Sequence, residues 1–440
     1  MKNKNFTLYI ISTSLGCVAL IFLGLFLSYL NTANVYKKQL ENMYEKNYYE
    51  MVSYVNTLEV DMSKLVATTS LDSQSELLGT IHTNSALCVN NINVLPFSSE
   101  KVSSVNNYFN SLYGFSESLI ENNKSGNVIS DDDLVQLDNM HTRLQEIQYD
   151  LNVYLAKMES SYSIIDDIDF NNSNNNNYSG GMIDNESSNA EIPTLIYDGP
   201  FSDSVLNKEI KGLPDTTITL EQAEEKLHNI FTQFSIEYIG DTVGKFETYN
   251  FDVKGDIDLY VSVTKRGGML LSITSFGSGT EQNKLSLQEG LDLAETFASD
   301  CGFENMYNVW YQNTGKILYV NLAPIVNHVI YYSDLIKVKI DLSLGLVVGW
   351  EASNYATNHT DREFTSSIGI LDGEKGVSSL MEIVERNLTI IPGKYVGEVS
   401  AYEYICKWKN YTYYIYVDSN TGKEVNILRV VNTTNGDLLM

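Results

Sequence analysis

The chain begins with a long uncharged run. Residues 6–30 read FTLYIISTSLGCVALIFLGLFLSYL, 25 positions without a charged side chain, whereas about 20 residues cross a bilayer as a helix. A secretory signal peptide has a shorter apolar core and a small-residue cleavage site, which NTANV at 31–35 matches poorly. The run therefore predicts a retained membrane helix. A short basic start with Lys2 and Lys4 normally stays inside, so we expect the bulk of the chain outside the cytoplasm.

Two stripes of apolar residues follow. In the first, from Tyr36 to Leu65, apolar residues recur every three or four positions, and the pattern repeats every eleven residues. The second runs from Leu134 to Met158 with the spacing of a heptad. Ser130 and Asp133 precede it as a helix-capping pair. Residues 105–120 between them also have helical spacing. We expect residues 31–165 to form a helical domain. His141 lies on the second stripe, and because one histidine offers no second metal ligand at helical spacing, we interpret it as a seam residue.

An asparagine-rich segment comes next. Residues 171–189, NNSNNNNYSGGMIDNESSN, contain eight asparagines and almost nothing to bury. Such a segment cannot offset its chain entropy, so we interpret residues 166–192 as an exposed linker. A cut here would, on this interpretation, separate the C-terminal part from the membrane.

The C-terminal part shows a repeated pattern of helix and strand signals. Each helix signal is a Ser or Thr followed three residues later by Gln or Glu, and each is followed by alternating strand sequence and a turn glycine. The helix signals are Thr219–Gln222, Ser286–Glu289 and Ser379–Glu382, and the glycines are Gly268, Gly345 and Gly422. The glycines are 77 residues apart both times, and an apolar residue stands five positions before each. This repeat predicts an internal duplication.

The last of these turns has the look of a calcium loop. Asp418, Asn420 and Gly422 occupy alternate positions, but the glycine and the bidentate Glu that complete an EF-hand loop are replaced by Lys423 and Arg429. Tyr414 and Tyr416 before the turn, and Val425 and Ile427 after it, recur at the strand period and favour a hairpin between two strands. We therefore expect no metal here.

Composition excludes several function classes. With 29 basic and 56 acidic residues the formal charge is −27, which opposes binding to nucleic acid. Outside the first run, Cys88, Cys301 and Cys406 form neither a disulfide framework nor a zinc motif, and we expect buried thiols. His359 and Asp361 could pair, but no nucleophile or metal set accompanies them. We therefore expect no catalytic residues and no cofactor.

Particular motifs resemble known proteins. Tyr416 to Val425, YVDSNTGKEV, resembles the PepSY domain, and PTLIYDGPFSD at 193–203 with LIKVKIDLSLGLVVGWEASNYATNHTDRE at 335–363 resembles the germination protein YpeB family. The resemblance covers nearly the full length and implies an α+β fold: a membrane anchor (1–30), a helical domain (31–165), the linker (166–192) and three PepSY-like repeats, each a helix packed on a small antiparallel sheet (193–277, 278–366 and 367–440).

The resemblance also implies a function. Family members are non-enzymatic partners of SleB, the hydrolase that degrades spore cortex peptidoglycan, and they lie in the spore inner membrane. From its motifs we expect Tyr197, Asp198, Phe201 and His359 to contact the partner. Two other functions stay open: an extracytoplasmic ligand-sensing or peptidase-inhibiting membrane protein, and a cell-wall hydrolase. Self-association through the helical stripes also stays open.

Overall fold

The computed structural model describes residues 2–97, 99–159, 164, 201, 209–275, 282–393, 397–433 and 436–440. The described chain divides into two compact units. The first consists of residues 1–59, 79–119 and 138–191, and the second of residues 60–78, 120–137 and 192–440. The predicted linker lies outside the described residues, as do Tyr197 and Asp198.

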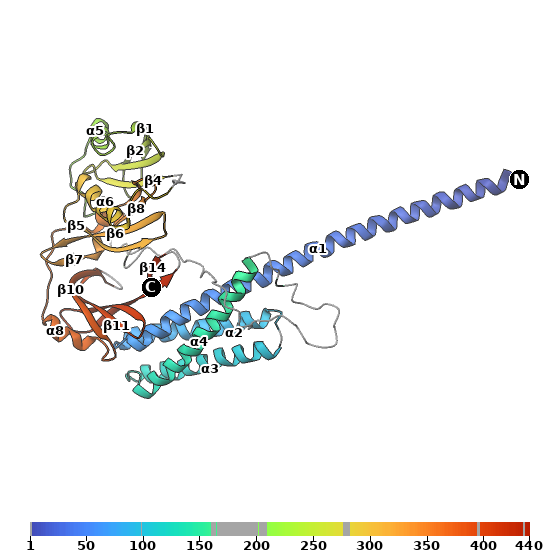
Figure 1. The fold of residues 1–440 in the computed structure, drawn as a ribbon, viewed down its shortest axis with the longest axis horizontal. Helices are drawn as coiled ribbons and strands as arrows, with labels where there is room; N and C mark the ends of the chain where they lie inside the picture. The colour runs from blue at the N-terminus through green and yellow to red at the C-terminus, as the bar shows by residue number, and fades with distance from the viewer. Residues whose placement is uncertain are drawn as a thin grey trace. The chain divides into compact units, whose positions relative to one another are not determined.

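Four long helices account for the N-terminal sequence (Figure 1). They are α1 (Lys2–Ala67), α2 (Leu71–Val94), α3 (Ser99–Lys124) and α4 (Asp131–Glu159). The two predicted stripes and the helix predicted over residues 105–120 are confirmed. The Ser130 side chain accepts a hydrogen bond from the Asp133 N–H at 3.2 Å and caps α4, as predicted. The sequence patterns did not single out α2.

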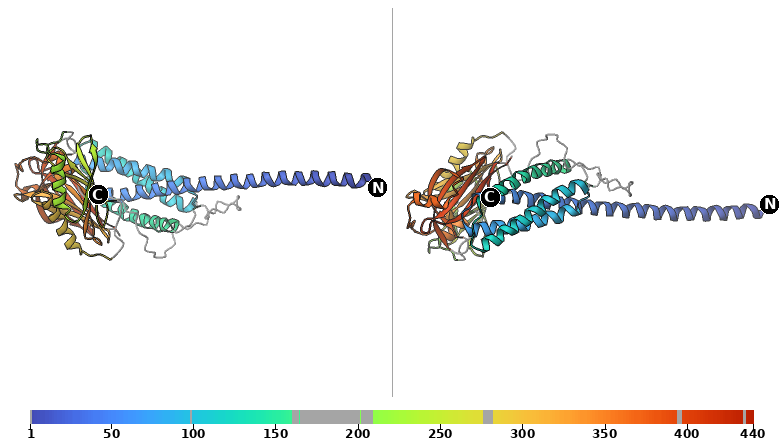
Figure 2. Two further views of the ribbon diagram at one scale, coloured as in Figure 1. Left: turned by 90° about the horizontal axis from the view of Figure 1, so that it is seen from above. Right: turned by 90° about the horizontal axis from the view of Figure 1, so that it is seen from below.

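The start of α1 has the exposure that a membrane span requires. Within the described side chains, α1 is long and apolar enough to cross a bilayer, and none of its most apolar window is buried in the protein. Leu15 is 70% exposed and Phe22 is 67% exposed. The helix is continuous over this length (Figure 2). Exposed apolar surface of this extent is unfavourable in water, so this part of α1 is a candidate membrane span.

Inside the first unit, α1 packs against α4 along the predicted seam. The Tyr48 hydroxyl donates to the Leu151 carbonyl oxygen at 2.6 Å. His141 is 3% exposed, and its Nε2 lies 3.0 Å from a carboxylate oxygen of Glu59. The prediction of a buried, satisfied seam histidine is therefore confirmed.

The second unit contains a continuous sheet. Among the described residues it has 14 strands in the order β1-β2-β3-β4-β9-β8-β6-β7-β10-β11-β12-β13-β14, with β5 paired to β6. All described neighbours are antiparallel except β7 and β10. The strands are β1 (Ser235–Thr242), β2 (Thr248–Lys254), β3 (Leu259–Thr264), β4 (Leu270–Ser275), β5 (Met306–Asn313), β6 (Ile317–Val326), β7 (Val329–Tyr331), β8 (Ile336–Asp341), β9 (Leu346–Glu351), β10 (Glu382–Pro392), β11 (Glu398–Trp408), β12 (Tyr411–Asp418), β13 (Glu424–Thr433) and β14 (Gly436–Leu439).

Helices of very different length accompany these strands. They are α5 (Leu220–Ile230), α6 (Leu287–Asp300), α7 (Ser353–Asn358) and α8 (Ile370–Gly373), with the 3₁₀ turns η2 (Tyr332–Asp334) and η3 (Glu374–Gly376). The capping boxes predicted at Thr219 and Ser286 both form, with the hydrogen bonds in both directions. α5 and α6 share one buried apolar cluster with one face of the sheet, which includes Val261, Val338 and Trp350.

The helix predicted after Ser379 is wrong. Residues 382–392 form β10, which pairs with β11 along its whole length and with β7 at Leu388–Ile390. This segment contains Ile383, Val384 and a Thr-Ile-Ile run at 389–391, and β-branched side chains favour strands. Sheet pairing therefore overrides a local match to a capping box.

The three predicted hairpins are confirmed, and they share an irregularity. β3–β4, β8–β9 and β12–β13 are antiparallel pairs, and the register shifts at Val263, Ile340 and Val417. Those are the apolar residues that stand five positions before the glycines. Each turn glycine has a positive φ, 61°, 70° and 71° in chain order, a conformation that favours glycine. At the third turn, Asp418 Oδ1 accepts the N–H groups of Asn420 and Thr421 at 2.7 and 2.8 Å.

The thiol prediction is confirmed for two of the three cysteines. Cys88 and Cys406 are free and buried, whereas Cys301 is partly exposed.

Candidate partner-binding site

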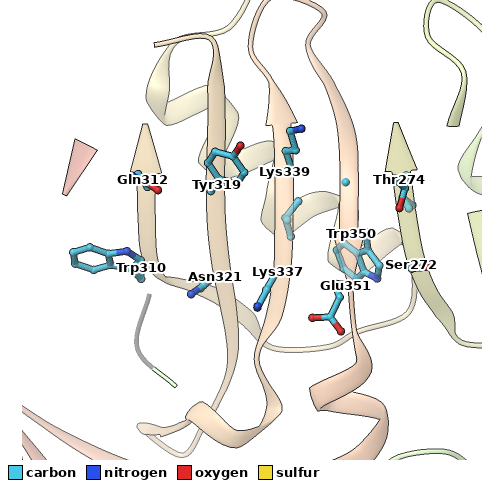
Figure 3. Close-up of a pocket in the computed structure, with 13 residues that line it drawn as sticks. Ser272, Thr274, Trp310, Gln312, Tyr319, Asn321, Lys337, Lys339, Trp350 and Glu351 are labelled. Atoms are coloured by element: carbon cyan, nitrogen blue, oxygen red, sulfur yellow. The ribbon is translucent and has the colours of Figure 1, made fainter. Parts of the chain in front are cut away.

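A cavity of about 260 Å³ lies on the sheet face opposite α5 and α6. Side chains alternate between the two faces of a strand, so Val338 of β8 points into the helix-covered core while Lys337 and Lys339 point the other way. Figure 3 shows how the neighbouring strands β5, β6, β8, β9 and β4 contribute to the lining. The lining residues are Ser272, Ile273, Thr274, Trp310, Gln312, Tyr319, Asn321, Lys337, Val338, Lys339, Gly349, Trp350 and Glu351.

Lys339 is accommodated because its neighbour on β9 is glycine. Gly349 is paired in register with Lys339. A Cβ atom at Gly349 would lie 2.9 Å from the Lys339 Cβ, closer than two carbon atoms pack. The side chain of Glu351 is engaged nearby, because its Oε1 accepts the Ser353 N–H at 3.0 Å. With two lysines and one glutamate, the lining carries a formal charge of +1 in a chain whose net charge is −27.

Trp310 adds an aromatic surface with an unused donor. Its ring lies edge-on to Tyr414, with 6.3 Å between the ring centroids. The indole Nε1–H is buried and has no hydrogen-bond acceptor within the described part of the chain. A buried donor without an acceptor is unfavourable. The cationic and amide donors of the lining suit a segment rich in carboxylate or carbonyl oxygens.

A second polar cluster is centred on η2, just after β7. Asp334 is fully buried and accepts two hydrogen bonds from Arg362, at 2.7 and 3.0 Å. Its Oδ2 also lies 2.7 Å from Nδ1 of His359. Arg362 continues to Glu398 of β11 at 2.8 Å. This network connects the segment after α7 with η2 and with β11.

His359 pairs with Asp334 in this network, and not with Asp361, the partner considered from the sequence. Its ring stacks on Tyr355 with 4.2 Å between the centroids, and its side chain is 37% exposed. Asp334 fixes the orientation of the ring from inside. His359 is thus a predicted contact residue with an exposed surface, while its Nδ1 atom is already paired with Asp334.

Phe201 lies mainly against other aromatic rings. Its ring centroid lies 5.4 Å from that of Tyr332 and 5.1 Å from that of Tyr416. The Tyr332 hydroxyl donates to Glu403 at 2.7 Å, and the Asn387 amide donates to the same carboxylate at 2.9 Å. Burial raises the pKa of Glu403 above its usual range, and burial likewise raises that of Tyr332. Phe201 therefore acts first as a packing residue.

The structure brings two predicted residues to one short element. Phe201 contacts Tyr332 and His359 binds Asp334, and both partners belong to η2. Sequence reasoning missed the cavity residues Trp310, Tyr319 and Lys339. The alternation Lys-Val-Lys at 337–339 was an available signal, because charged residues at alternate positions of a strand mark a face that does not enter the core.

Comparisons with known proteins add the following. A family model described as the YpeB N-terminal region matches residues 32–163, and one described as YpeB sporulation, PepSY1 and PepSY2 domains matches residues 179–365. The sporulation protein YpeB of Oceanobacillus iheyensis is 23% identical over 410 residues, 89% of this chain and 90% of the relative. The sporulation protein YpeB of Halalkalibacterium halodurans is 25% identical over 224 residues, 51% of this chain and 48% of the relative.

Among solved structures, the Bacillus megaterium YpeB C-terminal domain is similar with a TM-score of 0.44 and 22% identity, covering 49% of this chain and 99% of that one.

Proposed function

Because the chain belongs to the YpeB family, we propose that it is a non-enzymatic spore germination protein that stabilises or restrains the cortex-lytic hydrolase SleB. It would hold the hydrolase at the spore inner membrane through residues 6–30 and permit cortex peptidoglycan degradation on germination. The relatives' names, sporulation protein YpeB, support a role in spores. The exposed apolar surface of α1 supports the membrane location.

The architecture that we propose has three PepSY-like units, at 193–277, 278–366 and 367–440. The common position of the register shift in three hairpins supports this count. Since the units are joined edge to edge in one sheet, they offer one continuous surface.

The observation that carries the proposal is the cavity on the open face of that sheet. Two lysine side chains and Trp310 line it, while the chain as a whole is strongly acidic. Charge complementarity selects partners and raises the rate of association. We propose that an acidic segment of the hydrolase docks in this cavity, with Lys339 and Trp310 as the principal contacts.

A pull-down from dormant spore membranes tests the partnership. The hydrolase should be recovered with the wild-type chain and lost with the double variant Lys339→Glu, Trp310→Ala. Lys407→Ala is the matched control, because Lys407 is exposed on β11 and does not line the cavity. In a binding assay at low salt the double variant should bind at least about tenfold more weakly. Failure to recover the hydrolase with the wild-type chain would defeat the proposal.

An activity assay separates this function from a cell-wall hydrolase. Purified chain is incubated with cortex peptidoglycan, with and without SleB. We expect the chain alone to release no muropeptides and to change the rate or the stability of SleB when both are present. Release of muropeptides by the chain alone would make it an enzyme.

A further inference from the structure

Within its described residues, the third unit has no long helix on the sheet face that α5 and α6 cover in the first two units. Val263 and Ile340 of the first two hairpins belong to the cluster that contains α5 and α6. The corresponding Val417 belongs to a separate cluster, and this cluster includes Ala67, the last residue of α1. The only helical segments beside it in the third unit's described residues are the four-residue α8 and the three-residue η3. The end of α1 therefore covers part of this core.

Polar contacts fix this end of α1 in place. The Glu424 carboxylate, 4% exposed, accepts the Thr69 N–H at 2.7 Å and the Thr68 hydroxyl. The Thr69 hydroxyl donates to the Gly376 carbonyl oxygen at 2.8 Å. Because Thr68 and Thr69 directly follow α1, these bonds join the exit of the helix to the start of β13 and to η3.

A second contact lies one turn earlier on α1. Arg429, 2% exposed, donates to the Ser63 hydroxyl at 2.7 Å. The same guanidinium lies 4.7 Å from the ring centroid of Tyr411. The Tyr413 hydroxyl donates to the Ser63 carbonyl oxygen at 3.4 Å. A buried guanidinium held between strands and a helix is strongly position-specific.

We infer that Ser63, Ala67, Thr68 and Thr69 form a latch with Glu424 and Arg429, which keeps the third unit attached to the membrane helix without a covalent linker. The latch residues of α1 and its exit, at 63–69, come before the segment 171–189 in the chain, whereas their partners Glu424 and Arg429 come after it. A cut in the linker would therefore leave the two fragments bound. Release of the repeats from the membrane requires the latch to open as a separate step.

The test uses the full chain in detergent, with a site-specific protease sequence in place of part of residues 171–189. After cutting, the fragments are examined by size-exclusion chromatography at decreasing concentration. Wild-type fragments should co-elute. Glu424→Ala and Arg429→Ala should each weaken association at least about tenfold, because each leaves a buried donor or acceptor unpaired. Glu382→Ala and Lys407→Ala are the controls, because both side chains are exposed on the same unit.

Hydrogen exchange of the uncut chain gives a second readout that does not depend on recovering fragments. The Thr69 amide should be protected in the wild type and in Glu424→Gln, whose amide oxygen can still accept it, and should exchange faster in Glu424→Ala. Separation of folded wild-type fragments on cutting would overturn the inference. So would equal Thr69 exchange in the wild type and Glu424→Ala. Neither experiment involves the hydrolase, so the outcome is independent of the SleB proposal.

Discussion

Removal of the Asp334 carboxylate should be the most damaging single change in the η2 cluster. Asp334 is fully buried and receives two hydrogen bonds from Arg362, whose side chain is only 15% exposed. The Asp334→Ala variant removes both of these hydrogen bonds and leaves Glu398 as the carboxylate partner of the guanidinium. Hydrogen bonds to charged groups contribute about 1.5–3 kcal/mol each, so the loss of two should cost about 3–5 kcal/mol.

Thermal unfolding of the full chain in detergent, followed by circular dichroism, measures this cost. Each kcal/mol lowers Tm by about 2 °C in a unit of this size, so Asp334→Ala should lower Tm by about 6–10 °C. Asp334→Asn keeps a hydrogen-bond acceptor but loses the negative charge, so its Tm should lie between those of the wild type and Asp334→Ala. Glu382→Ala, an exposed acid on β10, should change Tm by less than about 1 °C. If Asp334→Ala matched that control, the network would not be the stabilising element that its geometry indicates.

The remaining predictions concern pH, metal, the anchor and the linker. Burial raises the pKa of Glu403 in the folded state. The stability that Glu403 contributes is therefore complete at a pH below its pKa in the unfolded chain, and it is lost as the pH rises through its pKa in the folded protein. Urea titrations should show the wild type losing stability relative to Glu403→Gln between these two pKa values. Calorimetric titration of the full chain with calcium should show no binding that Asp418→Ala removes, since Asp418 Oδ1 already accepts two backbone N–H groups. Intact-mass measurement of membrane-extracted protein should find residues 1–30 retained, and a soluble form beginning just after residue 30 would contradict the anchor. Limited proteolysis should cut first within 171–189, and a first cut inside a repeat would refute the linker.

Signals confined to a few neighbouring residues were sufficient to predict several elements. The capping boxes at Thr219 and Ser286 involve side chains three residues apart, and the turn glycines act within their own hairpins. The same kind of signal failed at Ser379, because strand pairing decided that segment: β10 pairs with β11, the next strand along the chain, and with β7, which lies far from it in sequence. Local patterns cannot report the strength of a distant strand pairing.

The candidate site depends on contacts that no local pattern contains. His359 pairs with Asp334, 25 residues earlier, instead of with Asp361, its neighbour in sequence. Phe201 reaches Tyr332 and Tyr416 across still larger separations. The cavity needs the order β5, β6, β8, β9 and β4, which differs from their order along the chain. Sequence therefore identified residues of interest but not what each of them touches.

The fusion of the units into one sheet limits how the chain can be shortened. β4 joins β9 through three residue pairs, and β7 joins β10 through three. An edge strand of one unit thereby pairs with an edge strand of the next. A strand edge left unpaired is a template for aggregation. The outer strand β1 carries Glu237 and Asp241 and a register shift, features that discourage edge-to-edge association. A recombinant fragment that ends near residue 366 would uncover β7 without any such protection, so soluble fragments should keep all the strands from β1 to β14 together.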